Sequence, residues 1–263
     1  MTDREVAIAV AEAGASIVRA RFGSALKRID KGAGDFATNA DIEAENAMVA
    51  IVRRERPQDA VVGEESGRSG ATGGGRVWLL DPLCGTLNYA ARMRVAAVNA
   101  ALMAGDTFLA AAVADPFNDE VYWTDVTSAG VRAGKHDAPL GPDAASRLVD
   151  LNLDPPFPNA ARFKAVVLAA DPEFAAAFRP RVVSSSMALT WVATGQRAAY
   201  VTDGDVRNSV HFAAGLAVCE AAGCVVTDLR GGSWRLGPAG LLVAANVETH
   251  EILLALVNKQ WSS

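Results

Sequence analysis

Segments with helical patterning alternate with short, strand-like apolar runs along most of the 263 residues. The compact run 77–80 is followed by three further runs of this kind, at 95–103, 108–114 and 120–123. The last three are separated only by short spacers, which is typical of antiparallel hairpins. Because strands interleaved with helices must bury their apolar faces against one another in layers, the sequence predicts a mixed α+β class.

Two long helices are predicted near the beginning of the sequence. The first opens with the capping box Thr2–Glu5, and apolar residues then recur at helical spacing as far as Ala20. The second runs from about Asn39 to Arg54, and Thr38 and Asp41 form a similar cap at its start. A short strand is expected at 61–62, and the compact run 77–80 is expected to end at Asp81-Pro82, because proline cannot donate to a sheet.

The alternation continues beyond residue 140. Strands are expected at 148–153, 182–183, 198–201, 224–227 and 241–244, and helices from about 159, up to 194, at 209–222 and at 249–258. We treat 1–263 as a single domain with an N-terminal half of about 1–140 and a C-terminal half of about 141–263. Prolines between 139 and 158 mark the boundary.

The charge and the cysteine content restrict which kinds of partner, and which cellular compartment, are expected for this protein. The formal net charge is −5, and no basic run supplies a footprint for nucleic acid, so no such partner is expected. No stretch approaches the roughly 18 apolar residues of a membrane helix, so no membrane partner is expected either. Three cysteines cannot form a disulfide framework, and Asp3 and Glu5 stand where a signal peptide would be basic. We therefore expect a cytoplasmic protein.

Acidic residues stand at the ends of several predicted elements. Asp41 lies at a helix start, Glu64 and Glu65 follow one strand, and Asp81 follows the next. Taken singly, these residues fit a helix cap, a solvated turn and a strand end. If the two strands are neighbours, however, the carboxylates converge and offer the oxygen ligands that Mg²⁺ prefers.

These segments resemble the inositol monophosphatase family. That family's pattern W-x-x-D-P-[IL]-D-G-T-x-N-[FY] matches Trp78–Tyr89 except at one position, and its second signature, W-D-x-A-A-G, appears here as Val210–Gly215. Further matches follow the family order: 38–41, 63–66, 220–223 and 227–228. The resemblance implies an α+β fold, the layered α-β-α-β-α sandwich of the inositol monophosphatase and fructose-1,6-bisphosphatase type.

The resemblance also implies a catalytic site. The residues that match Glu64, Asp81 and the Leu83 carbonyl hold one Mg²⁺ in the family. Those that match Asp41 and Thr86 orient and deprotonate the attacking water. The leading hypothesis is therefore a hydrolase of a small phosphorylated polyol or sugar.

Substrate contacts and assembly are implied in the same way. The N–H groups of Gly85 and Thr86 would cradle the phosphate at a helix start, where partial positive charge favours an anion. Asp203 and Asp205 fall in the loop where the family contacts substrate. Family members commonly dimerise, so a homodimer is expected, with the apolar hairpin 95–114 contributing to its surface.

This sequence departs from the family at a second metal position. The residue matching Asp81 shares a second metal there with two aspartates, and those two are Cys84 and His211 here. In one interpretation the second metal is lost and both residues are structural. In another, Asp81, Cys84 and His211 offer the oxygen, sulfur and nitrogen ligands that suit Zn²⁺.

A third interpretation makes Cys84 a nucleophile. His211 would be the third residue of a helix capped by Asn208, so it would stay neutral and accept the thiol proton. The pKa of Cys84 would then lie below its ordinary value, with the N–H groups of Gly85 and Thr86 acting as an oxyanion hole. This interpretation predicts a metal-independent acyl-transfer or hydrolytic enzyme. A binding protein without turnover is the remaining alternative.

Overall fold

The computed structural model describes residues 1–32, 35–70, 75–125, 127–153 and 163–261. Among these residues, no helix combines the length and the apolar character that crossing a bilayer requires. The chain divides into two compact units. The first comprises Met1–Pro139, Ser185–Met187 and Asn208–Val218, and the second comprises Leu140–Ser184, Ala188–Arg207 and Cys219–Ser263.

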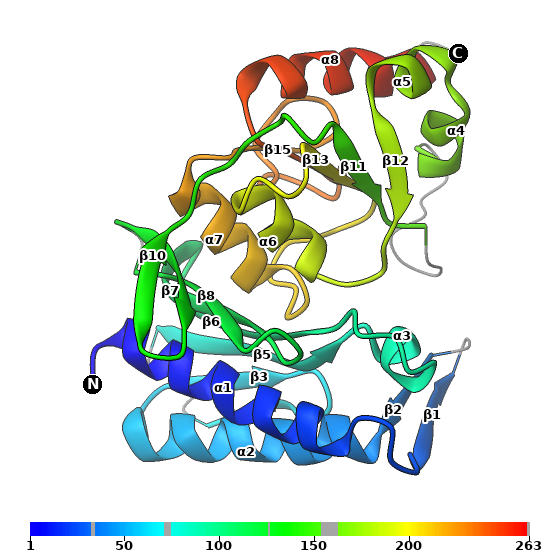
Figure 1. Ribbon diagram of the computed structural model, residues 1–263. Coiled ribbons are helices and arrows are strands. Elements are labelled where there is room, and N and C mark those ends of the chain that lie inside the picture. Colours follow the sequence, from blue (N-terminus) through cyan, green and yellow to red (C-terminus); the bar gives the residue numbers. More distant parts are fainter. Residues whose placement is uncertain (33–34, 71–74, 126, 154–162, 262–263) are drawn as a thin grey trace. The chain divides into compact units, whose positions relative to one another are not determined.

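The first unit is built on an eight-stranded sheet in the order β10-β9-β8-β7-β6-β5-β3-β4 (Figure 1). Its strands are β3 (Ala60–Gly63), β4 (Gly67–Ser69), β5 (Arg76–Cys84), β6 (Ala97–Ala104), β7 (Thr107–Asp115), β8 (Glu120–Thr124), β9 (Ala129–Ala133) and β10 (His136–Pro139). A separate antiparallel pair is formed by β1 (Arg28–Gly32) and β2 (Asp35–Thr38). From β5 to β10 every neighbouring pair is antiparallel, which confirms the expected hairpins.

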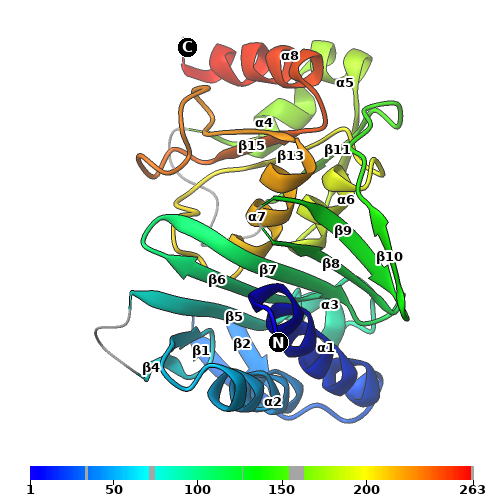
Figure 2. The same cartoon turned by 90° about the vertical axis from the view of Figure 1, so that its left-hand side faces the viewer.

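Two helices, α1 (Asp3–Arg21) and α2 (Asn39–Glu55), lie side by side against this sheet (Figure 2). Both were expected, and both caps form: Thr2 accepts from the Glu5 N–H, and Thr38 and Asp41 form a complete capping box. Val6, Val10 and Met48 are fully buried in one cluster with side chains of β5 to β8. A short helix, α3 (Thr86–Ala90), follows β5.

The expectation that a strand ends at Asp81-Pro82 is wrong, because β5 continues to Cys84. β3 pairs with it in parallel as far as Leu80, and β6 pairs with it antiparallel as far as Cys84. The register with β6 shifts between Asp81, which faces Asn99, and Cys84, which faces Ala97. Pro82 falls inside this irregularity, where its missing N–H costs no regular ladder bond.

The hairpin 95–114 does not provide an exposed apolar surface. It forms β6 and β7 in the interior of the sheet, and Val98, Leu102 and Val113 are fully buried within the single chain. The expected contribution of this hairpin to a dimer surface is therefore wrong, because its apolar side chains are already used in the core.

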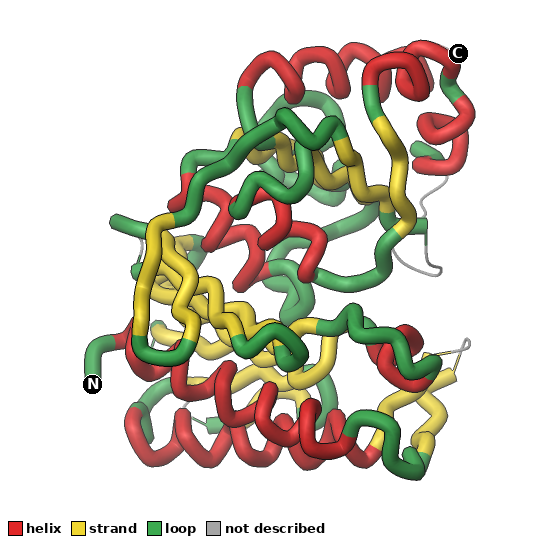
Figure 3. Tube along the Cα trace, viewed as in Figure 1, coloured by secondary structure: helices red, strands yellow, loops and turns green. Residues whose placement is uncertain are grey.

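The second unit has a five-stranded sheet in the order β12-β11-β13-β15-β14. Its strands are β11 (Leu148–Leu151), β12 (Arg179–Val182), β13 (Ala199–Thr202), β14 (Val225–Thr227) and β15 (Leu241–Ala244). Figure 3 draws strands in yellow and helices in red. Helices α4 (Ala165–Ala170), α5 (Pro172–Ala177) and α8 (Val247–Asn258) pack into its core, and a 3₁₀ turn (Lys259–Trp261) ends the described chain. The mixture of helices and sheets in both units confirms the α+β class.

Two helices, α6 (Met187–Ala193) and α7 (Ala213–Ala222), contain residues of both units. The predicted helix at 209–222 begins later than expected, since Asn208 adopts a left-handed conformation and His211 lies in the turn before α7. The start of the helix expected from about 159 lies outside the described residues.

Candidate active site

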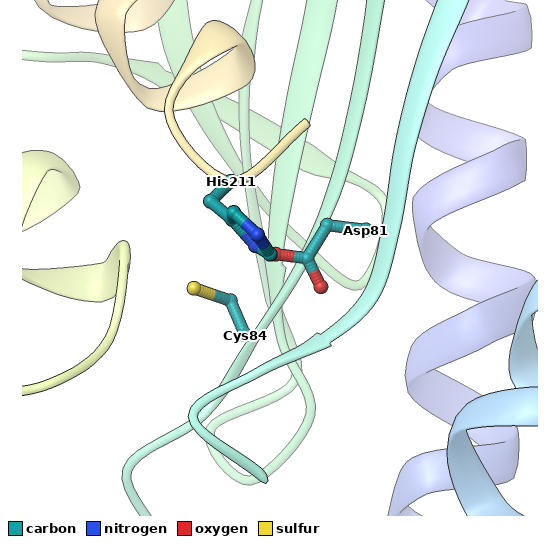
Figure 4. A group of neighbouring side chains, drawn as sticks. All are labelled: Asp81, Cys84 and His211. Atoms are coloured by element: carbon teal, nitrogen blue, oxygen red, sulfur yellow. The ribbon is translucent and has the colours of Figure 1, made fainter. Parts of the chain in front are cut away.

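An aspartate–histidine pair lies at the carboxyl end of β5. Asp81 is fully buried, and its Oδ2 lies 2.8 Å from His211 Nδ1. Its Oδ1 accepts from the Leu83 N–H at 3.0 Å, and Asn99 Nδ2 approaches Oδ2 at 3.4 Å. In Figure 4 the His211 ring, from the segment before α7, reaches the Asp81 carboxylate. The structure therefore brings together two residues that are 130 positions apart.

Cys84 lies beside the Asp81–His211 pair. Its Sγ accepts a hydrogen bond from the Ser186 N–H at 3.2 Å, and its carbonyl accepts one from Ser185 Oγ at 3.0 Å. The Ser186 hydroxyl is in turn within 2.8 Å of Asn99 Nδ2. The sequence did not indicate Ser185, Ser186 or Asn99, because no motif or spacing connects these residues to the loop at 81–86.

Burial and neighbouring charges shift the pKa values of Asp81, Cys84 and His211. Partial burial opposes a charged His211, but the charge and hydrogen bond of Asp81 prevail and raise the pKa of His211 well above its ordinary value. Burial likewise opposes a charged Asp81, yet His211 lowers the pKa of this carboxyl. Burial, together with the negative charge of Asp81, raises the pKa of the Cys84 thiol. The expectations of a neutral His211 and of a thiol titrating below its ordinary value are both wrong.

A second carboxylate, Glu64, lies just beyond β3 and near Asp81. Burial, and then the negative charge of Asp81, raise the pKa of Glu64 to about 8. Lys31 Nζ pairs with Glu64 Oε1 at 2.9 Å and with Glu65 Oε1 at 2.6 Å. The other oxygen, Glu64 Oε2, is buried and has no hydrogen-bond partner among the described residues. Lys31 was not singled out from the sequence, because a lysine in a β-hairpin usually faces solvent.

Asp41 and Thr86 are brought together as the family resemblance implied. Thr86 Oγ1 lies 3.1 Å from Asp41 Oδ1 and 3.0 Å from the Leu83 carbonyl. The other Asp41 oxygen accepts from the Thr38 N–H at 2.9 Å and from the Thr38 hydroxyl. Burial outweighs these hydrogen bonds and raises the pKa of Asp41. The α2 capping box therefore also fixes the direction of one carboxylate oxygen toward Thr86.

The structure shows the local geometry at the two substrate-contact positions that the family resemblance implied. Gly85 has a left-handed conformation and caps α3, of which Thr86 is the first residue, so their N–H groups do lie at a helix start. Asp203 is buried and accepts from the Gly204 N–H, whereas Asp205 is half exposed and pairs with Arg207 at 2.6 Å. Both aspartates belong to the second unit, and their contact with substrate stays a prediction.

Glu45, which the sequence did not indicate, holds the loop after β3. Its buried carboxylate accepts from the N–H groups of Glu65 and Ser66, each at 2.8 Å. Gly63 leaves room for this carboxylate, since a Cβ at residue 63 would lie 2.6 Å from Glu45 Oε1. The glycine in the Gly63–Ser66 motif is therefore required by a helix residue 18 positions earlier in the chain.

We expect Gly63→Ala to lower the free energy of unfolding by about 1–3 kcal/mol, because the added methyl group forces Glu45 away from the two N–H groups. Chemical denaturation measures the loss. Gly141→Ala is the matched control, since a Cβ at Gly141 meets nothing within 4 Å, and it should be close to neutral. Equal stability of both variants would contradict the proposed role of Glu45.

The site offers two groups of donor atoms to a metal ion. Glu64, Asp81 and the Leu83 carbonyl supply the hard oxygens that suit Mg²⁺. A cation here would give the buried Glu64 Oε2 a partner and would favour the ionised form of this carboxyl. Asp81, Cys84 and His211 form a second group, whose ligand atoms all lie within 4.8 Å of one another. The residues present therefore fit a cation at the first position and offer a different donor set at the second.

Comparisons with known proteins identify relatives of this chain. The model of the "Inositol monophosphatase family", a metal-dependent family, matches residues 2–262. The chain is 32% identical over 240 residues to inositol-1-monophosphatase ImpA of Mycolicibacterium smegmatis, covering 87% of this chain and 82% of that one. It is 30% identical over 236 residues to an inositol-1-monophosphatase of Caulobacter vibrioides, covering 85% and 88%.

Solved structures show the same fold. The suhB protein of Bartonella henselae superimposes with a TM-score of 0.82 at 23% identity, covering 97% of this chain and 98% of that one. This likeness confirms the α+β sandwich of the inositol monophosphatase and fructose-1,6-bisphosphatase type. Together with the family model across residues 2–262, these matches establish that the chain belongs to the inositol monophosphatase family.

Proposed function

We propose that this chain is a Mg²⁺-dependent phosphoric monoester hydrolase that acts on a small phosphorylated polyol or sugar. The observation that carries the proposal is the buried, unpartnered Glu64 Oε2 close to Asp81, in a family of phosphatases. Relatives named inositol-1-monophosphatase support the choice of substrate class.

In this proposal Glu64, Asp81 and the Leu83 carbonyl hold Mg²⁺. The ion, when bound, supplies Lewis-acid polarisation of the phosphoryl oxygens. Asp41 accepts the proton of the attacking water, and the Thr86 hydroxyl, 3.1 Å from Asp41 Oδ1, orients that water. The N–H groups of Gly85 and Thr86 bind the phosphate oxygens. A homodimer and a cytoplasmic location remain predictions.

The second metal position is expected to bind Mg²⁺ weakly, since a thiol and an imidazole replace two carboxylates. Turnover of inositol 1-phosphate with Mg²⁺ should therefore be slow and should disappear with chelator. We expect the double substitution Cys84→Asp with His211→Asp to raise this Mg²⁺-dependent turnover at least about tenfold, because a cation is worth several kcal/mol to phosphoryl transfer.

Steady-state hydrolysis of inositol 1-phosphate, measured over a range of Mg²⁺ concentrations, tests both statements. A folded double variant with no gain would contradict the assignment of residues 84 and 211 to the second metal position. Failure of either protein to hydrolyse any of a panel of phosphorylated polyols and sugars would contradict the proposed function itself.

The thiol-enzyme alternative predicts the opposite result, because the double substitution removes its nucleophile and its base. The raised pKa of Cys84 disfavours the thiol-enzyme alternative, because the thiolate is the reactive form of cysteine. A binding protein without turnover would show no hydrolysis in any of these measurements.

A further inference from the structure

We infer that Asp81, Cys84 and His211 form a binding site for a thiophilic divalent cation of the Zn²⁺ class. The inference deepens the proposed function by naming the cation at the second position, but it can be tested by binding alone. The three ligand atoms lie within 4.8 Å of one another. A tetrahedral Zn²⁺ with bonds of about 2.0–2.3 Å keeps its ligands roughly 3–4 Å apart, so small side-chain movements suffice to close the site.

The donor set selects against Mg²⁺. Cys84 supplies sulfur and His211 supplies nitrogen, while Asp81 supplies the only carboxylate of the three. Mg²⁺ prefers oxygen, whereas Zn²⁺ accepts thiolate, imidazole and carboxylate ligands in tetrahedral sites. Three protein ligands also leave a fourth position open, as in catalytic zinc sites.

Hydrogen bonds around the three ligands support this assignment. The Ser186 N–H points at Cys84 Sγ at 3.2 Å, the direction that stabilises a thiolate. Leu83 and Asn99 donate to the two oxygens of Asp81, and Asn99 is held by the Ser186 hydroxyl. Such outer contacts orient metal ligands in proteins and stabilise their anionic forms.

Burial and charge also favour a cation here. Asp81 is fully buried, and the Glu64 side chain beside it is only 16% exposed. Among the described residues, Lys31 pairs with Glu64 and Glu65, and His211, which must release its second ring proton before it can bind a metal, pairs with Asp81. His211 has a 42% exposed side chain, so a cation reaching the three ligands would not have to cross the core.

Co²⁺ is a suitable probe, because it occupies Zn²⁺ sites and its bond to a thiolate gives a charge-transfer absorption in the near ultraviolet. The full chain, stripped of metal with a chelator, would be titrated with Co²⁺ and then with Zn²⁺ or Mg²⁺. We expect one equivalent of Co²⁺ to produce the thiolate band and the visible spectrum of tetrahedral Co²⁺. Zn²⁺ should displace it stoichiometrically, and a large excess of Mg²⁺ should not.

Matched variants assign the ligands. Cys84→Ser should abolish the thiolate band, and His211→Gln should weaken Zn²⁺ binding at least about 100-fold. Cys224→Ser and His136→Gln replace a partly exposed thiol and an exposed imidazole elsewhere, so binding should be unchanged in both controls. If Cys84→Ser does not fold, alkylation of the unaltered chain replaces it. Zn²⁺ should then protect Cys84 and leave the alkylation rate of Cys224 unchanged.

Three results would overturn the inference: no thiolate band in the unaltered chain, a band that survives Cys84→Ser, or displacement of Co²⁺ by equimolar Mg²⁺. None of these depends on hydrolysis. A chain that binds Zn²⁺ as described but hydrolyses no phosphomonoester would contradict the proposed function and leave this site standing.

Discussion

Asp41→Asn is expected to lower phosphomonoester hydrolysis by about 10²–10⁴-fold, the usual contribution of a general base. The substitution is nearly isosteric, and asparagine is itself a favourable residue near helix starts. Its amide cannot accept a proton from water, however. The loss should appear in kcat rather than in KM, because Asp41 acts on the attacking water and is not assigned to substrate binding.

Thr86 provides the matched control for this experiment. Thr86→Ser keeps the hydroxyl that lies 3.1 Å from Asp41 Oδ1 and should retain most of the activity, whereas Thr86→Val should lose activity as Asp41→Asn does. Circular dichroism and the melting temperature establish that each variant is folded. Near-normal kcat in a folded Asp41→Asn variant would show that another group accepts the proton.

Arg197→Met is expected to lower the free energy of unfolding by about 3–5 kcal/mol, because it leaves a buried carboxylate without its partner. Asp150, in β11, is fully buried, and its two oxygens lie 2.9 and 3.0 Å from Arg197 Nε. For a chain of this length the melting temperature should fall by roughly 6–20 °C. Thermal and chemical denaturation measure both quantities.

The stability lost in Arg197→Met should depend on pH. Burial raises the pKa of Asp150 in the folded chain, although Arg197 opposes the rise. A carboxyl whose folded pKa exceeds its unfolded value of about 3.9 contributes stability at low pH, which is lost as the pH rises through the folded value. Without Arg197 that folded value lies higher still. The deficit of the variant should therefore be smallest near pH 4 and grow toward neutral pH.

Arg207→Met is the control for the second prediction. Arg207 forms a similar ion pair with Asp205 in the same unit, but both side chains are about two-fifths exposed. Exposed ion pairs contribute at most about 1 kcal/mol, so this variant should be nearly neutral and show little pH dependence. Equal losses in the two arginine variants would contradict the importance assigned to burial of Asp150.

Elements with strong local signals could be predicted from the sequence. α1 begins at its capping box, α2 begins at Asn39 as expected, and β15 spans the predicted run 241–244. The two helix starts depend on contacts within a few residues, whereas β15 was marked by its apolar run and forms by pairing with β13 and β14. The end of β5 could not be predicted, because its continuation to Cys84 depends on pairing with β6 across an irregularity that accommodates Pro82.

The candidate site shows the same division. Asp41 and Thr86 were expected to act together, and the structure brings them within 3.1 Å. Lys31, Glu45 and Ser186 were not expected, since no motif or spacing in the sequence connects these residues to the site. Their roles depend on pairing between elements distant in the sequence, which a single sequence does not reveal.

The sequence by itself determined which chemical groups are available: a family motif in which a thiol at residue 84 and an imidazole at residue 211 stand in place of two carboxylates. Only the tertiary structure decided the state of those groups. Burial and the adjacent Asp81 carboxylate raise the pKa of Cys84. For His211 the same carboxylate raises the pKa against the opposing effect of burial, so the metal-free chain favours a neutral thiol beside an imidazolium. Protonation follows solvation and neighbouring charge, and both are properties of the folded chain.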